Sequence, residues 1–116
     1  MAGMIRNAYT AVLARGDTWE GLVHTEPYEA AWAAEAVFFV RVMQVKAGAG
    51  SVAMAQVQIS PDGMHWVNEG ASMDLQAQPG ALSFVRVANF GGWLRLAVAV
   101  PHGTAIQVVA TLALKG

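Results

Sequence analysis

Apolar and polar positions alternate with a period of two along most of the chain. The alternation is clearest over residues 93–100 and 106–114, where every second residue is Leu, Val, Ile or Ala. Side chains on a β-strand point alternately to opposite sides of the sheet, so this period predicts strands with one buried face. Further strands are predicted at residues 9–14, 37–45, 52–60, 65–69 and 82–88, and a looser one at 18–25.

Turn-forming residues separate these segments. Asp62 and Gly63 lie between the strands predicted at 52–60 and 65–69. Asp-Gly favours a tight hairpin because glycine adopts a positive φ without strain, so we predict a hairpin turn at Asp62 and Gly63. Other breaks fall at residues 46–51, 79–80, 89–92 and 101–103, and residues 70–80 are predicted to form a polar connection.

Seven to nine short strands separated by turns are typical of a β-sandwich or barrel. Residues 1–116 are therefore predicted to form one all-β domain, a single β-sandwich of jelly-roll or immunoglobulin-like topology with at most one short helix. Residues 28–35 could form that helix, because Ala and Glu favour it, or an irregular approach to the next strand. The predicted core is Val40, Val42, Val57, Ile59, Trp66, Val85, Val87, Leu94, Leu96, Val98, Val108 and Leu112.

The segment 37–45 is almost continuously β-branched or aromatic. Residues 37–40, Val-Phe-Phe-Val, place bulky side chains on both faces of one strand, whereas a two-layer sandwich normally buries only one face. The outward face is therefore expected to meet either residues 28–35 or another subunit. Arg41 and Gln44 are predicted to lie on opposite faces, which leaves the outward face open to a mixed interface.

The composition also favours contact between copies of the chain. Hydrophobic residues make up 55% of the sequence and charged residues only 13%, against roughly 25% charged residues in an average soluble domain. Alanine accounts for part of the apolar excess, but the shortage of charge remains. A domain this small has much surface for its volume, so some apolar surface is expected to be covered by a homo-oligomer.

Charge and cysteine content narrow the partners and the compartment. The net charge is −1 and the basic residues are dispersed, which argues against nucleic acid or an anionic membrane as a partner. Cysteine is absent, which suits a reducing cytosol without excluding export. No signal peptide is evident at the N-terminus. The long uncharged run at 96–114 is interrupted by Pro101-His102-Gly103, so it is better explained as two strands than as a membrane span.

Residues for catalysis or metal binding are not grouped along the sequence. His24, His65 and His102 lie in separate segments, without the close spacing of zinc ligands. Residues 17–35 are rich in Asp and Glu but lack the alternating oxygen ligands of a calcium loop, and no serine lies in a nucleophile elbow. We therefore predict that the protein is not an enzyme and has no catalytic, cofactor or metal site.

The aromatic residues allow two functions. Trp19, Trp32, Trp66 and Trp93 could form a sugar-stacking platform, as in a carbohydrate-binding β-sandwich module, which is the alternative function. Aromatic residues more often fill a core or anchor a protein interface. The residues predicted to contribute to an interface are Trp19, Tyr28, Trp32, Phe38, Phe39, Phe90 and Trp93.

The hairpin and the order of segments carry a family resemblance. Residues 60–66, Ser-Pro-Asp-Gly-Met-His-Trp, resemble the Ser-x-Asp-Gly-x-x-Trp hairpin of discoidin-like and other β-sandwich modules, and look like the Asp-box of sialidase propellers with one residue missing. The order of segments along the chain carries the resemblance further; these segments are residues 20–29, 37–45, 56–66, 84–87 and 93–96. Over about residues 18–114 it resembles small β-sandwich virion accessory proteins, for head decoration or tails, of tailed bacteriophages and prophages.

The resemblance implies a non-enzymatic structural or assembly protein, located in a virion or at its cytoplasmic assembly. Such a protein would self-associate and bind a symmetric lattice of capsid, tail or shell protein. A closed ring is the expected product of self-association, and a trimer would fit a lattice with local three-fold points. Shell-associated proteins of cellular origin would have the same sequence features.

Overall fold

A computed structural model describes residues 8–116 and contains nine β-strands and, over those residues, no helix. The strands are β1 (Ala8–Trp19), β2 (Leu22–His24), β3 (Tyr28–Glu29), β4 (Glu35–Ala47), β5 (Val52–Ser60), β6 (Val67–Gln76), β7 (Leu82–Ala88), β8 (Trp93–Ala99) and β9 (Ala105–Lys115). No helix in this part of the chain is long and apolar enough to cross a membrane. The all-β prediction is confirmed.

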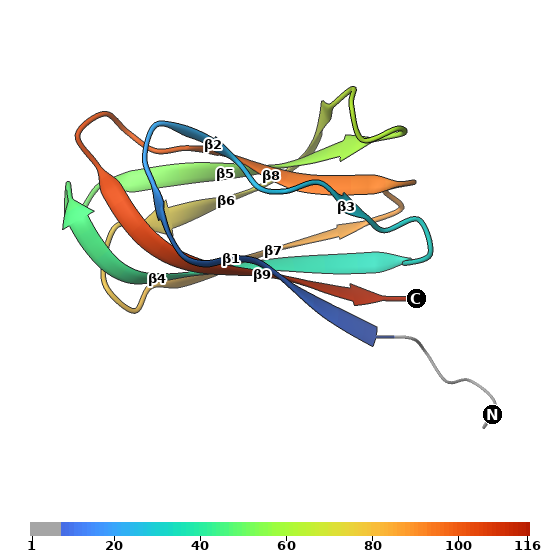
Figure 1. Ribbon diagram of the computed structural model, residues 1–116, viewed down its shortest axis with the longest axis horizontal. Coiled ribbons are helices and arrows are strands. Elements are labelled where there is room, and N and C mark those ends of the chain that lie inside the picture. The colour runs from blue at the N-terminus through green and yellow to red at the C-terminus, as the bar shows by residue number, and fades with distance from the viewer. Residues whose placement is uncertain (1–7) are drawn as a thin grey trace.

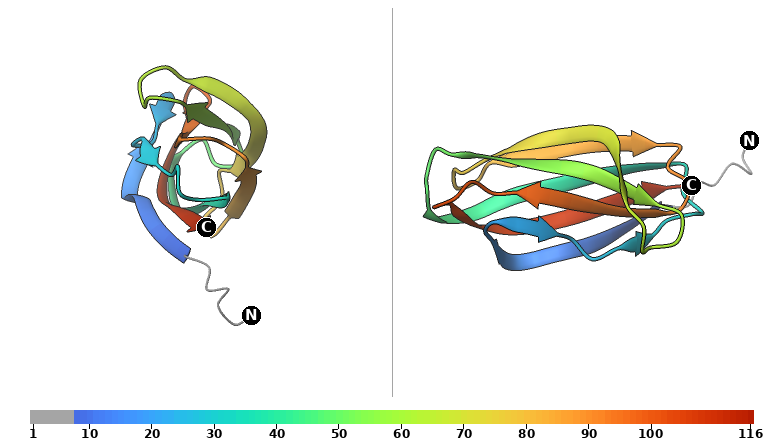
Figure 2. Two further views of the ribbon diagram at one scale, coloured as in Figure 1. Left: turned by 90° about the vertical axis from the view of Figure 1, so that its right-hand side faces the viewer. Right: turned by 90° about the horizontal axis from the view of Figure 1, so that it is seen from above.

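The strands form two antiparallel sheets packed face to face (Figure 1). Sheet A has the order β1-β9-β4-β7, and sheet B has the order β2-β8-β5-β6, with β3 also pairing with β8. Figure 2 shows the two layers end-on. The chain crosses from one sheet to the other at every connection except β2–β3 and β5–β6. This strand order is that of a jelly roll, with β2 and β3 sharing one strand position, so of the two predicted topologies it is the jelly roll that forms.

The core lies between the sheets and is built by the alternation seen in the sequence. Phe38 and Val40 of β4 and Leu94 and Leu96 of β8 are fully buried. Ten of the twelve predicted core residues are buried, and Ile59 is partly buried against them. Trp66 was wrongly predicted to be in the core, since it lies outside it and one face of its ring is covered by the Arg95 guanidinium, 4.3 Å from the ring centroid.

Two segments differ from the sequence prediction. Strand β6 continues through residues predicted to be a polar connection, and Met73 and Leu75 on it point into the core. The helix allowed for at residues 28–35 is absent, because Tyr28 and Glu29 pair with β8 instead. A helix of two turns gains too few hydrogen bonds to compete with pairing to an existing sheet.

A β-bulge in β4 changes the outward face of that strand. The register shifts between Val42 and Gln44, so Arg41 lies opposite Val109 and Gln44 lies opposite Gln107. Directly opposite residues share one face of a sheet, and both of these partners point away from the core. Arg41 and Gln44 therefore lie on the same face, not on opposite faces as predicted.

Candidate interaction surface

The outer face of sheet A carries an apolar row that crosses all of its strands. Phe39 of β4 lies opposite Phe84 of β7 on one side and opposite Thr111 of β9 on the other. Thr111 in turn lies opposite Val12 of β1. The Phe39 and Phe84 rings are in contact, with their centroids 6.2 Å apart. Strands that are distant in sequence thus build one mainly apolar strip, with Thr111 between Phe39 and Val12.

The exposure of this strip is high for large apolar side chains. Phe84 is 51% exposed, Val12 47%, and Leu82, which lies opposite Arg41, 63%. We call this surface the sheet A face; its apolar members are Val12, Val37, Phe39, Leu82, Phe84, Val109 and Ala113. Exposed apolar patches of this kind mark sites of contact with another molecule.

Basic side chains stand among the apolar ones. Arg15 and Arg41 both lie opposite Val109, from β1 and β4, and Arg86 lies opposite Val37. The Arg86 guanidinium is 5.1 Å from the centroid of the Phe84 ring, a cation–π contact. Within residues 8–116 the structure gives none of these three arginines an ion pair. They are therefore available to an acidic partner.

A shallow hollow lies at one end of the sheet A face. Its volume is about 360 Å³, and it is lined by the ends of β4, β7 and β9. Arg86 stands on its wall, with Lys115 and Glu35 as further charged groups. The hollow is continuous with the sheet A face through Val37 and Ala113, so it belongs to the same surface.

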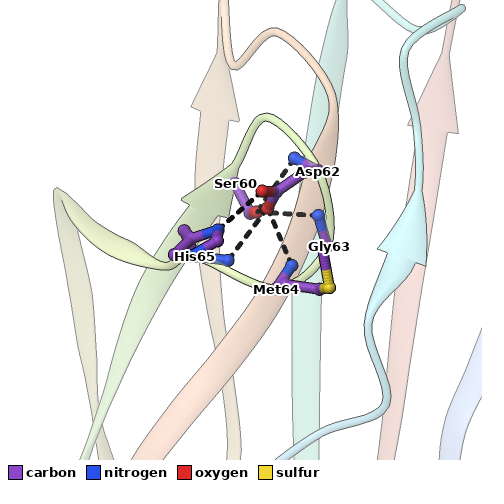
Figure 3. A network of polar contacts seen from close by, with 5 residues as sticks. All are labelled: Ser60, Asp62, Gly63, Met64 and His65. Carbon is purple, nitrogen blue, oxygen red and sulfur yellow. Dashed lines mark hydrogen bonds and ion pairs between the residues drawn. The ribbon is translucent and has the colours of Figure 1, made fainter.

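The β5–β6 turn holds its own polar groups, as Figure 3 shows. Ser60 Oγ accepts hydrogen bonds from the backbone N–H groups of Asp62 and Gly63, at 3.2 and 2.8 Å. Asp62 Oδ1 accepts from the N–H groups of Met64 and His65, both at 2.9 Å, and Asp62 Oδ2 lies 2.6 Å from His65 Nδ1.

These contacts give the turn a structural role. Hydrogen bonds hold the pKa of Asp62 below its ordinary value. The largest contribution comes from the backbone N–H of His65, the next from the His65 side chain, and the third from the backbone N–H of Met64. Gly63 has a φ of 78°, the positive φ on which the prediction of a hairpin turn at Asp62 and Gly63 was based. The Asp62 carboxylate is used inside the loop, so it is not set up to bind a ligand. In the part of the chain that the structure describes, no three His, Asp or Glu residues are grouped to hold a metal.

The tryptophans are spread through the fold. Trp19 is buried, and Trp32 is 45% exposed in the β3–β4 connection. Trp93 is partly buried, and a Cβ placed on Gly63 would come within 3.1 Å of its ring, so the ring packs against that glycine. One face of Trp66 is covered by Arg95, whose Nε donates to Gln58 Oε1 at 2.8 Å. Burial of Trp19 and these contacts of Trp66 and Trp93 give those three tryptophans a packing role within the chain.

Three of the aromatic residues predicted at an interface lie in the core. Trp19, Phe38 and Phe90 are only 3%, 0% and 5% exposed, because they point between the sheets, so the prediction was wrong for them. The other four are at the surface, where their role at an interface stays a prediction. Phe39 belongs to the sheet A face, and Tyr28 stacks on Tyr9 with ring centroids 6.2 Å apart; the other two are Trp32 and Trp93.

The sequence prediction did not include the most exposed members of the sheet A face. Leu82, Phe84 and Arg86 alternate with the buried Val85 and Val87. The signal was present, because Leu82 and Phe84 are apolar on the side of the strand that a sandwich turns to solvent.

Comparison with known proteins finds similarity of this chain to solved structures but not to known sequences. No protein-family model and no curated protein matches the sequence. The crystal structure of YomS, a protein derived from the SPBc2 prophage, matches 97% of this chain and 96% of its own, with a TM-score of 0.62 and 5% identity. A chain in the structure of infectious bursal disease virus, Gx strain, matches 97% of this chain and 32% of its own, with a TM-score of 0.58 and 15% identity. The similarity is one of fold. At such identities it establishes the β-sandwich, in one prophage protein and one virus, and nothing finer.

Proposed function

We propose that this chain is a non-enzymatic structural protein of a phage virion or a related particle, and that it self-associates and binds a symmetric lattice of capsid, tail or shell protein. The observation that carries this proposal is the sheet A face, with Leu82, Phe84 and Val12 left uncovered by the chain itself. The fold shared with a prophage protein and with a virus chain supports it.

The chemistry of the sheet A face is that of an interface core. Aromatic residues and arginine are enriched at protein interfaces, whereas lysine and glutamate are depleted. The centre of this face has Phe39 and Phe84 with Arg41 and Arg86 around them, and Lys115 and Glu35 lie only at its end. Arginine beside an aromatic ring contributes both apolar contact and charge, which suits a surface that another protein covers.

The oligomeric state tests this function. Sedimentation equilibrium at micromolar concentration should give the wild-type chain a mass well above the 12.2 kDa of one copy. The double substitution Leu82→Ser and Phe84→Ser should weaken association at least about tenfold, because it removes the two most exposed large apolar side chains of the face. Both side chains are more than half exposed, so the fold itself should be kept.

A substitution in the other sheet provides the matched control. Val67 of β6 is 59% exposed, close to the exposure of Leu82, but lies in sheet B. Val67→Ser should leave the mass of the assembly unchanged. A wild-type chain that remains a monomer would overturn the proposal of self-association. An oligomer that loses nothing on the double substitution would overturn the role of the sheet A face.

A further inference from the structure

The charges of the chain are separated in space although its net charge is close to zero. The outer face of sheet A carries the basic residues Arg15, Arg41, Arg86 and Lys115 and one acidic residue, Glu35. The other seven acidic residues all lie between residues 8 and 116, on β1, β3, β6 and the turns, and the remaining described basic residues are Lys46, near the end of β4, and Arg95 of β8. Within residues 8–116 the sheet A face is therefore basic, and the rest of the surface carries more acidic than basic residues.

This distribution disfavours contact between two copies of the same face. Arg15 and Arg41 stand on the two strands that flank β9, so they are about 10 Å apart across the middle of the face. A two-fold contact would bring these arginines against the arginines of the partner in a region from which water is excluded. Like charges brought together in this way oppose association. The complement of the sheet A face must carry acidic groups.

The chain itself offers an acidic and apolar surface along one edge of the sandwich. Figure 2 shows β1 along one long edge of the sandwich, with β2 and β3 following one another along the same edge in the other sheet. Asp17, Glu20, Glu26 and Glu29 are all exposed on these strands and the turns that join them, and we call this surface the acidic edge. Leu22 lies between Glu20 and Glu26 in the chain, on β2, where the edge meets the outer side of sheet B, and it is 86% exposed, the highest exposure of any large apolar side chain between residues 8 and 116.

The sheet A face and the acidic edge complement each other in charge, and both carry exposed apolar side chains. The sheet A face combines an apolar strip with arginines, and the acidic edge combines a protruding Leu22 with carboxylates. We infer that the sheet A face of one copy binds the acidic edge of a second copy, head to tail. This inference rests on the self-association proposed above. Contact between two different surfaces of the same chain closes into a ring when the rotation between copies completes a circle.

Charge reversal on each surface tests this contact. A face variant carries Arg41→Glu and Arg86→Glu, and an edge variant carries Glu20→Arg and Glu26→Arg. All four side chains are exposed, so each variant should keep the β-rich circular dichroism spectrum of the wild type. Each variant alone should associate at least about tenfold more weakly at low salt, where charge interactions are least screened. Asp74→Arg, in sheet B, is the matched control and should associate like the wild type.

Restoring complementarity gives the decisive result. The chain that carries all four substitutions has an acidic face and a basic edge, so it should regain the association that each pair removes. An equimolar mixture of the face variant and the edge variant should co-assemble for the same reason. If the wild-type chain self-associates but the edge variant behaves like it, or the four-fold variant does not recover, the head-to-tail contact is wrong and self-association stands. A wild-type monomer would overturn both proposals.

Discussion

Replacing Gly48 by alanine should destabilise the fold more than the same change at its neighbour Gly50. Both glycines lie in the β4–β5 turn with positive φ, 75° at Gly48 and 87° at Gly50. A Cβ at Gly48 would come within 2.3 Å of Thr104 Oγ1, 2.8 Å of Thr104 Cα and 2.9 Å of the Gly103 carbonyl oxygen. At Gly50 it would meet nothing within 4 Å.

The two substitutions separate backbone strain from overlap. Left-handed backbone costs an alanine about 1–2 kcal/mol, and this cost applies to both positions. Overlap in a packed region adds about 1–3 kcal/mol, and it applies only at Gly48, where two of the opposing atoms belong to the backbone of the β8–β9 connection. Thr104 is only 4% exposed, so its side chain has little room to move away. Gly48→Ala should therefore lower the free energy of unfolding by about 1–3 kcal/mol more than Gly50→Ala.

Urea unfolding followed by tryptophan fluorescence measures the difference. With a slope of about 1–3 kcal/mol per M of urea, the midpoint for Gly48→Ala should lie about 1 M below that for Gly50→Ala. Both proteins must be compared at one concentration, because the self-association proposed above would stabilise the folded chain. Equal midpoints would refute the reasoning, since they would mean that the β8–β9 connection moves aside without cost.

Two further predictions concern the hydrogen bonds that Asp62 and Thr25 accept. The folded-state pKa of Asp62 is lowered, so the contribution of its carboxylate to stability is present above the unfolded pKa and is lost as the pH falls through the folded pKa. Asp62→Asn should abolish the acid-induced shift of the Met64 and His65 amide signals in NMR spectra. A variant that keeps this shift would contradict the assignment. Thr25→Val should cost about 1–3 kcal/mol in thermal unfolding, because the Leu96 N–H loses the Thr25 Oγ1 acceptor at 2.9 Å, whereas Thr25→Ser should cost clearly less.

Strand positions follow closely from the alternation of residue types. Strands β5 and β7 have the bounds predicted for them, because each buries one face and turns the other outward. The extent of β6 was missed, because Gly70 and several polar residues leave only Met73 and Leu75 to mark its inward face. Its pairing with β5 supplies the stability that local sequence does not indicate.

The candidate interaction surface was harder to predict than the strands. Phe38 and Phe39 are identical neighbours, and only the packing of the two sheets decides that Phe38 is buried and Phe39 is outward. The bulge in β4 that places Arg41 and Gln44 on one side has no signature in the sequence. The sheet A face gathers β1, β4, β7 and β9 from the whole length of the chain, so its residues can be grouped only when the topology is known.

The position of β9 has a consequence for synthesis of the protein on the ribosome. Strand β9 lies between β1 and β4, and it pairs with β1 from Ala8–Lys115 to Trp19–Ile106. Within sheet A, β1 has no other neighbour. A nascent chain therefore carries β1 unpaired until residues 105–115 have emerged, and non-local pairing of this kind slows folding. The complete sheet A face, which spans β1, β9, β4 and β7, cannot form before that moment, so contact between copies through the whole face can only follow synthesis of β9.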